Sequence, residues 1–426
     1  MRTIELNALS TLELELLYKR PSINMDNTIS TVKPILEAVK LHGLDKVIEY
    51  AKKFDSFNLT ALKVTDDEFD DSEISLTTDV KEAIIKAASN IRRFHSKQVP
   101  KDYELETMPG VLCKREFRAI ENVGLYIPGG TAVLPSTMLM LGIPAKIAGC
   151  RRIIACSPTS DKLNPAVLYA AKVAGVKEIY KVGGAQAIAL MAYGVEEVKK
   201  VDKIFGPGNQ FVTAAKTLVS IDPDGCLVDM PAGPSEVLVI ADEMANPSYI
   251  AADLLSQAEH GVDSQVILVT TSSKLVEDVK LELQKQLDDL PRKDIAAKCL
   301  DNSLNILANS IDEAIKFSNE YAPEHLIINI ENVDDYLSMI TNAGSVFVGP
   351  YTPESVGDYA SGTNHSLPTY GFAKAIGGVS VEMFMKSMTF QKLSKEGLNE
   401  LSKTVITLAE TESLKAHANA VKVRFK

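Results

Sequence analysis

The amino-acid sequence predicts an α/β protein with two Rossmann-like lobes built on parallel-sheet cores, and with small helical segments at both ends of the chain. Two observations predict this class. The chain has 426 residues, which exceeds the size at which a single hydrophobic core stops growing, so more than one lobe is expected. After Gly149, short apolar runs alternate with helical segments, which is typical of a parallel sheet with crossover helices.

The first hundred residues are expected to be mainly helical. The clearest signal covers residues 79–98, where Asp79 and Glu82 form a capping-box pattern before an amphipathic helix. The first α/β series follows Gly149, with the strands RRIIAC, EIYKV and KIFG and the helices NPAVLYAAKVAG, AQAIALMAYG and NQFVTAAKTLVS. Turn residues in PAGPSE then interrupt the pattern and predict the junction between the lobes.

The second α/β series starts at EVLVIAD and continues with SQVILVTTS, LNILANS, HLIINI and GSVFVG, which are separated by helical segments. From about residue 380 onward no strand pattern remains, and the tail is predicted to be helical. Because this tail has little apolar core of its own, we expect it to pack on another subunit.

Composition places the chain among ordinary globular proteins and argues against several partners. The formal net charge is −11 and Lys and Arg form no block, so we expect no nucleic-acid partner. The N-terminus lacks the order of a signal peptide, and the uncharged stretch 122–145 holds too many Gly and Pro residues for a lipid-facing helix. The five cysteines lack the spacing of a disulfide framework or a thiolate zinc site. We therefore expect a cytoplasmic protein with no membrane partner.

Gln257 and His260 lie near the end of a predicted helix in LLSQAEHG, at a spacing that brings both side chains to one face. That geometry suits two ligands of one metal ion, although a histidine stabilised by the helix dipole is the more frequent meaning of such a pattern. Asp358 follows the strand GSVFVG in the loop VGDYASGTNH, where ligating groups are often presented, but an Asx turn is the alternative. His365 in the same loop is open to the same two interpretations and ranks below Asp358.

Glu324 and His325 follow a proline at the start of the strand HLIINI, at a lobe edge where α/β sites collect. Adjacent side chains there point in different directions and could serve two proton transfers, since an imidazole with a pKa near ~6.5 can remove an alcohol proton at neutral pH. An ordinary strand-entry pair explains these residues equally well.

Glu412 and His417 lie about 140° apart on a predicted helix of ~3.6 residues per turn, so a surface helix is the simpler interpretation.

Seven separated segments together resemble the histidinol dehydrogenase family. They are VDMPAGPSEVLVIADEMANPSYIAADLLSQAEHG, GLYIPGGTAVLPSTMLM, KVGGAQAIALMAYG, FGPGNQFV, APEHL, GDYASGTNHSLPT and ETESLKAHANAV. The resemblance spans essentially the whole chain. The glycine clusters among these segments contain no GxGxxG, so on their own they indicate turns rather than a dinucleotide site.

The resemblance implies roles for individual residues. Glu324 and His325 match the family's catalytic pair, with His325 as the base in the hydride-transfer steps and Glu324 activating water. A zinc ion is implied with four ligands, the last supplied by the partner subunit: Gln257, His260, Asp358 and His417. Substrate contacts are implied for Ser235, Gln257, His260, His325, Asp358, Glu412 and His417. Cofactor contacts are implied for Tyr126, Gln186 and Asn209.

The family reaction is the four-electron oxidation of L-histidinol to L-histidine through L-histidinal, the last step of histidine biosynthesis. We therefore expect an NAD-dependent dehydrogenase with one zinc ion per subunit, working as a homodimer with shared active sites. An enzyme of the same family that oxidises another small alcohol is the nearest alternative. A non-catalytic metal-binding protein that retains the fold is the more distant one.

The domain organisation expected from these patterns and from the resemblance has four parts. Residues 1–22 form an N-terminal helical segment. Residues 23–122 and 236–378 form a discontinuous first lobe, and residues 123–235 form a second lobe that contacts the cofactor. Residues 379–426 form a helical tail that contributes to the partner's site.

Overall fold

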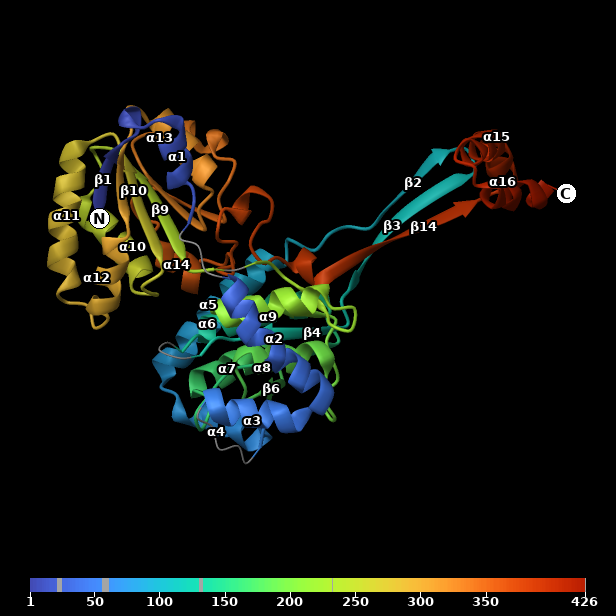
Figure 1. Cartoon of the computed structure of the whole chain (residues 1–426), viewed down its shortest axis with the longest axis horizontal. Helices are drawn as coiled ribbons and strands as arrows, with labels where there is room; N and C mark the ends of the chain where they lie inside the picture. Colours follow the sequence, from blue (N-terminus) through green and yellow to red (C-terminus); the bar gives the residue numbers. More distant parts are fainter. Residues whose placement is uncertain (21–24, 56–60, 130–132, 232, 426) are drawn as a thin grey trace.

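The computed structural model describes residues 1–20, 25–55, 61–129, 133–231 and 233–425. Two α/β lobes lie next to each other, and a long arm leaves the body and carries the C-terminus at its tip (Figure 1). The expected class, two lobes with parallel-sheet cores, is confirmed. Among the described residues, every helix is too short or too polar to span a bilayer.

The first lobe is built on a parallel sheet with the strand order β1-β11-β10-β9-β12-β13. Its strands are β1 (Arg2–Glu5), β9 (Glu236–Ala241), β10 (Gln265–Thr270), β11 (Leu304–Leu307), β12 (His325–Asn329) and β13 (Ser345–Val348). Its helices are α1 (Thr11–Leu17), α10 (Pro247–Ala258), α11 (Ser273–Leu287), α12 (Lys293–Asp301), α13 (Ile311–Tyr321) and α14 (Glu354–Tyr359). Short 3-10 helices are η1 (Leu6–Ala8), η2 (Val333–Asp335), η3 (Leu337–Met339) and η4 (Phe372–Lys374).

The central strand β9 explains why the apolar runs of this lobe are continuous rather than alternating. Val237 and Val239 pack into a cluster with residues of α10, α11 and α12, whereas Leu238 and Ile240 pack into a second cluster with residues of α1 and α13. Both faces of the strand are therefore buried, which is the usual condition of a parallel sheet covered by helices on both sides.

The second lobe is built on a parallel sheet with the order β6-β5-β4-β7-β8. Its strands are β4 (Asn122–Tyr126), β5 (Arg152–Cys156), β6 (Glu178–Tyr180), β7 (Lys203–Phe205) and β8 (Leu227–Val228). Its crossover helices are α6 (Pro135–Ala148), α7 (Pro165–Ala174), α8 (Gly184–Tyr193) and α9 (Gln210–Ile221). Counted from β4 here and from β9 in the first lobe, both sheets contain the Rossmann order 3-2-1-4-5, and β1 extends the first sheet beyond β11.

The N-terminal helices belong with the second lobe, which corrects the expected grouping of residues 23–122 with 236–378. They are α2 (Met25–His42), α3 (Leu44–Phe54), α4 (Asp66–Ser75) and α5 (Thr78–His95). Their buried faces pack against α6, α7, α8 and α9. An amphipathic pattern shows which face of a helix is buried but not what covers it, so the sequence could not assign these helices to a lobe.

The N-terminal residues are likewise part of a lobe, because β1 extends the first sheet by pairing with β11. This corrects the expectation of a purely helical segment over residues 1–22. The expected boundary between residues 22 and 23 lies outside the described residues.

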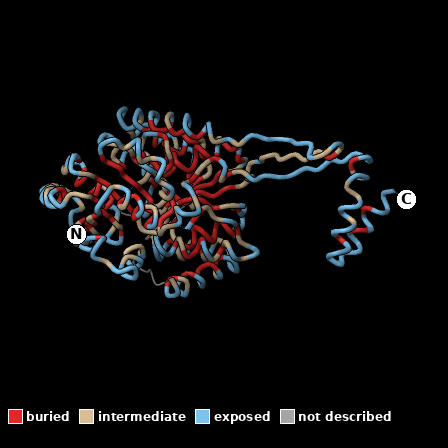
Figure 2. The backbone as a smooth tube through the Cα atoms, turned by 90° about the horizontal axis from the view of Figure 1, so that it is seen from above, coloured by how far each residue is buried: buried red, intermediate tan, exposed pale blue. Residues whose placement is uncertain are grey.

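The arm is an antiparallel ribbon with the strand order β14-β3-β2, and its tip carries α15 (Lys395–Thr411), α16 (Lys415–Lys422) and the 3-10 helix η6 (Val423–Phe425). The strands are β2 (Tyr103–Met108), β3 (Val111–Ala119) and β14 (Met385–Leu393), and β14 follows the 3-10 helix η5 (Val381–Phe384). The predicted all-helical tail is therefore wrong at β14. Most residues of this ribbon are exposed (Figure 2), so it lacks the apolar alternation that marks a half-buried strand.

Candidate active site

Most of the predicted site residues of the first lobe gather at the amino edge of its sheet. Ser235 immediately precedes β9, and His325 is the first residue of β12, which pairs with β9. Gln257 lies in the last turn of α10, and His260 follows that helix. Since α10 runs antiparallel to the strands, its carboxyl end meets the amino edge. Open α/β sheets usually bind ligands at the opposite, carboxyl edge.

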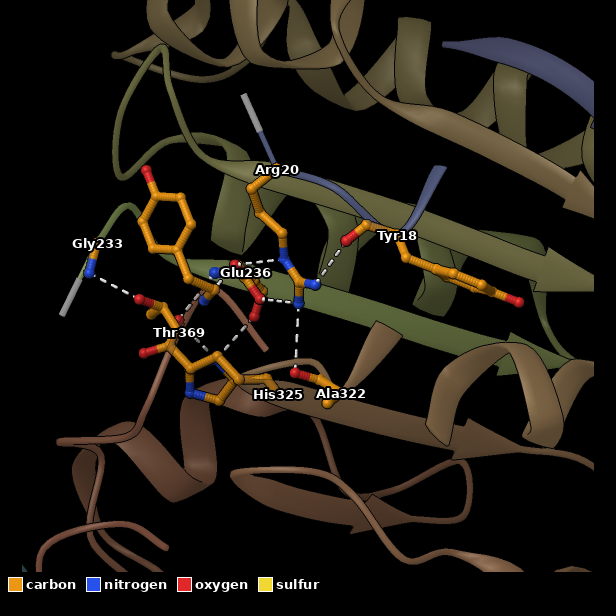
Figure 3. A network of polar contacts seen from close by, with 9 residues as sticks. Tyr18, Arg20, Gly233, Glu236, Ala322, His325 and Thr369 are labelled. Carbon is orange, nitrogen blue, oxygen red and sulfur yellow. Dashed lines mark hydrogen bonds and ion pairs between the residues drawn. The ribbon is translucent and has the colours of Figure 1, made fainter. Parts of the chain in front are cut away.

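Glu324 and His325 are both held by the backbone of Glu236, the first residue of β9. The Glu236 amide donates to Glu324 Oε2 over 2.8 Å, and the Glu236 carbonyl lies 3.1 Å from His325 Nδ1 (Figure 3). Because a carbonyl can only accept, Nδ1 carries the proton and Nε2 is left as the basic nitrogen of the neutral ring. Within the described part of the chain, Nε2 is buried and has no hydrogen-bond partner. It faces Asp358 Oδ1 at 3.6 Å.

A cluster of metal-ligand type lies beside this dyad. One ligand atom each of His260, Glu354 and Asp358 falls within 4.8 Å of the others. Gln257 is fully buried and touches Glu354. With its amide nitrogen turned toward Glu354, it donates to both carboxylate oxygens, the longer contact being 3.1 Å. The structure thus places Gln257 beside the cluster that contains His260 and Asp358; for all three the resemblance implies metal binding.

Glu354 is a site residue that the sequence reasoning missed. It opens α14 and lies four residues before Asp358, so both carboxylates leave the same face of this short helix. The sequence analysis expected a loop around Asp358, whereas the structure has the helix α14 there. Without that helix the spacing of four residues does not indicate that the two carboxylates share a face.

Burial and charge perturb the acid–base groups of the site strongly. Burial raises the pKa of Glu324 and that of Glu354 to about 8. Burial alone would lower the pKa of His325, but the carboxylates of Glu354, Glu324 and Asp358 outweigh it and raise this pKa to about 10. Burial opposes ionisation of Asp358, yet the close contact with His325 and the charge of that ring lower the pKa of Asp358. The site is therefore an acidic cavity that favours a positive charge in its centre.

His365 and its loop join the two lobes at the site. His365 Nδ1 lies 2.9 Å from the Asp358 carbonyl, and Nε2 lies 3.1 Å from Thr137 Oγ1 in the first turn of α6. A small cavity of about 50 Å³ is lined by Ser235 and Glu324 from the first lobe and by Gly206 from the end of β7 in the second. The amino edge of the first sheet therefore meets the carboxyl edge of the second.

A much larger cavity, about 1390 Å³, lies beyond the carboxyl ends of the strands of the second lobe. All three predicted cofactor residues, Tyr126, Gln186 and Asn209, line it. Its volume exceeds the ~300–1,000 Å³ typical of small-molecule sites. Asp55, at the end of α3, also lines it and was not predicted: its Oδ2 accepts from Gln186 Nε2 over 3.3 Å and from the amide of Gly183 over 3.2 Å.

Glu412 and His417 do not reach this site within one chain. Glu412 is exposed in the turn between α15 and α16, and His417 is exposed on α16, so the one helix predicted to carry both is wrong. Both lie at the tip of the arm, far from α10 and α14 (Figure 1). The ribbon between them and the body has paired strands along its length, so the tip has no loose tether with which to fold back.

Comparison with known proteins gives one family. The family model for histidinol dehydrogenase matches residues 18–425. The histidinol dehydrogenase of Bacteroides thetaiotaomicron is 53% identical over 410 residues, which cover 96% of this chain and 95% of the relative. The chloroplastic histidinol dehydrogenase of Arabidopsis thaliana is 52% identical over 429 residues, covering 100% and 92%. A crystal structure of histidinol dehydrogenase from Elizabethkingia anophelis has a TM-score of 0.93 at 49% identity, covering 100% and 98%.

The raised pKa values predict that the metal-free protein loses stability as pH rises. Folding raises the pKa of Glu324 and that of Glu354 from 4.5 to about 8, and it raises the pKa of His325 from 6.5 to about 10. Between the two values of each pair, the group keeps its proton in the folded chain but not in the unfolded chain. Because the folded state then binds more protons than the unfolded state, the free energy of unfolding falls with pH across both windows. Thermal melts of chelator-treated protein should show a Tm that drops from pH 6.5 to 8.

Glu354→Gln should make this drop shallower, since it removes one of the groups concerned. Glu320→Gln, which changes an exposed carboxylate on α13 paired with Lys374, is the matched control and should keep the wild-type slope. Equal slopes for Glu354→Gln and wild type would contradict this account of the site.

Proposed function

This chain belongs to the histidinol dehydrogenase family, and we propose that it oxidises L-histidinol to L-histidine through L-histidinal, with NAD as hydride acceptor and one zinc ion per subunit. This reaction is the last step of histidine biosynthesis. The observation that carries the proposal is the convergence of the Glu324–His325 dyad with His260 and Asp358 at the junction of the two lobes.

The donor set fits a zinc ion. An imidazole nitrogen, a carboxylate oxygen and an amide oxygen would come from His260, Asp358 and Gln257, and the remaining protein ligand would be His417 of the other subunit. Glu354 supports this arrangement, because a carboxylate that accepts from the Gln257 amide nitrogen leaves the amide oxygen free to bind a cation.

The residues of the dyad then divide the proton transfers. When bound, zinc supplies a fixed positive charge that orients the substrate and balances the surrounding carboxylates, and the dinucleotide supplies the hydride acceptor. The neighbouring carboxylates raise the pKa of His325 while no cation is bound, and a bound cation would offset them. Neutral His325 would then remove the proton of the alcohol through Nε2. Glu324, whose pKa burial raises to about 8, takes a proton from the water that adds to the aldehyde. Once His325 has released its first proton to solvent and a second NAD has replaced the NADH, His325 removes the proton of the new hydroxyl group, so one site serves both oxidations.

The large cavity of the second lobe is proposed to hold the dinucleotide. Tyr126, Gln186 and Asn209 line it, and the amino ends of α8 and α9 lie at its wall. Amide groups and helix dipoles at such ends favour phosphate groups, so this cavity can bind a dinucleotide without the GxGxxG pattern.

A homodimer with exchanged arms is proposed to complete each site. The ribbon and tip helices expose large apolar side chains, among them Leu105, Phe390, Leu408, Leu414 and Phe425. A projecting element with so much exposed apolar surface is typical of an interface between subunits. Such a partner would bring Glu412 and His417 to the site that a single chain leaves without them.

We also expect the protein to act in the cytoplasm. All five cysteines are free thiols in the structure, which suits a reducing compartment.

The direct test is the absorbance of NADH when L-histidinol and NAD are added to the zinc-loaded protein. Production of NADH and histidine is expected, and a chelator should abolish it. His325→Ala should lower kcat by about 10²-fold or more, the range of general-base catalysis, while zinc content changes little. Near-normal turnover in His325→Ala would contradict the role of this residue as the base.

Shared sites predict complementation between two inactive chains. A heterodimer of His417→Ala and His325→Ala chains contains one site with both histidines intact, so some activity should return when the two variants are mixed and re-associated. Two differently tagged chains allow the heterodimer to be isolated and assayed. No recovery in the isolated heterodimer would count against the shared site.

The lining of the large cavity predicts which side chains contribute to the affinity for the dinucleotide. Gln186→Ala should weaken NADH binding by roughly tenfold, the cost expected for one lost buried polar contact. The chain contains no Trp, so the fluorescence of NADH can be titrated without background from tryptophan emission or energy transfer. Thr217→Ala, on the exposed side of the neighbouring helix α9, is the control and should bind NADH as wild type does. Equal affinities for the two variants would place the dinucleotide elsewhere.

A further inference from the structure

Arg20 stands outside every role described above, yet it lies at the centre of a buried polar network behind the dyad. It forms a two-pronged ion pair with Glu236: Nε donates to Oε1 over 2.9 Å and Nη2 donates to Oε2 over 2.8 Å (Figure 3). The side chains are 6% and 1% exposed. A buried charge pair of this geometry is costly to break, because removing one partner leaves the other charge unpaired.

The same guanidinium also holds the turn that leads into the dyad. Nη2 donates to the Ala322 carbonyl over 3.3 Å, and Nη1 donates to the Tyr18 carbonyl over 3.0 Å. The guanidinium lies 3.5 Å from the centre of the Tyr321 ring. Ala322 has a φ of 52°, a left-handed conformation that a side chain disfavours, so this turn needs external support.

Arg20 therefore contacts both the turn that leads into the dyad and the neighbouring strand whose backbone holds the dyad. Glu236 presents its amide to Glu324 and its carbonyl to His325. Ala322 stands just before Glu324 and ends α13. The Glu236 carboxylate further accepts from the amide of Tyr370 over 2.9 Å, which ties the loop after His365 to the same point.

We propose that Arg20 is a positioning residue for the dyad: through Glu236 and Ala322 it sets the placement of Glu324 and the tautomer of His325. This rests on the proposed function of the dyad. Arg20 touches neither substrate nor cofactor in this role. A lysine could supply the charge but not the fork that reaches Glu236 and Ala322 together, so geometry rather than charge should decide the effect of a substitution.

The test compares Arg20→Met and Arg20→Lys with wild type in the zinc-loaded, full-length enzyme. Misplacing a catalytic group by about 1 Å can cost 10²-fold in rate, so Arg20→Met is expected to lower kcat by about 10- to 100-fold. The KM for histidinol, the affinity for NADH and the zinc content should stay within about twofold to threefold. Arg20→Lys should fall between Arg20→Met and wild type.

Arg152→Met is the matched control. Arg152 forms the same two-pronged pair with Glu178, at 3.0 and 2.6 Å, at the amino end of the second sheet and outside both cavities. It should lower thermal stability while kcat stays within about twofold of wild type. If Arg20→Met does not fold, the kcat of Arg20→Lys is compared with that of Arg152→Lys instead.

A second substitution separates positioning from a general loss of stability. In a His325→Gln background the dyad is already disabled, so adding Arg20→Met should change the residual kcat by less than about threefold, because coupled residues are not additive. If Arg20→Met lowers kcat by the same factor in the His325→Gln background as in the wild type, the proposal is wrong. It is also wrong if Arg20→Met folds and has the wild-type kcat.

A crystal structure of Arg20→Met distinguishes this proposal from the proposed function, because it requires no turnover. Loss of the contacts from the Glu236 backbone to Glu324 and His325 is expected, and their retention would overturn the positioning role. If the wild-type enzyme makes no NADH from histidinol, the proposed function is refuted. The crystal structure of Arg20→Met would still show whether Arg20 positions Glu324 and His325.

Discussion

The arrangement of the site depends on how the two sheets face each other: the carboxyl edge of the second sheet faces the amino edge of the first sheet. Helices α6, α8 and α9 begin at the carboxyl edge of the second sheet, so their partial positive ends point toward the junction. Helices α10 and α13 end at the amino edge of the first sheet, so their partial negative ends point toward the same place. One side of the junction therefore favours anions and the other favours cations. The proposed phosphate-bearing cofactor and the proposed metal ion are divided between them accordingly.

The position of the dyad at the beginning of two paired strands has a second consequence. Inside a sheet, backbone amides and carbonyls are used by the ladder, whereas at a strand end they are available to side chains. Glu236 uses both of its backbone groups in this way, one for each member of the dyad. The geometry of the proposed catalytic pair is therefore set by backbone atoms of Glu236, whose side chain is buried in an ion pair with Arg20.

Much of this architecture could be predicted from the sequence, and the exceptions have physical causes. Most strands of the two parallel sheets are continuous apolar runs because both faces are covered, and eight of them lie where predicted, whereas β1, β4 and β8 were not predicted. Strands β2, β3 and β14 pair with one another largely in solvent, so no apolar pattern marks them. In the site, Glu324 and His325 were recognisable as a pair at a strand start. The contact of Arg20 could not be predicted, because 216 positions separate it from Glu236 and no local sequence pattern indicates that they meet.

The paired strands of the arm determine where the tip helices are held. A flexible loop could carry Glu412 and His417 back to their own site, but a three-stranded ribbon cannot, because its ladder fixes the direction in which the tip is held. A ribbon also presents the tip helices to a neighbour without the entropy cost of ordering a loose segment. If the tip residues complete the site of a second chain, then association is part of assembling the site, and the stability of the site depends on protein concentration. Each chain would then hold a cofactor cavity and a dyad of its own but complete its metal centre only in the dimer.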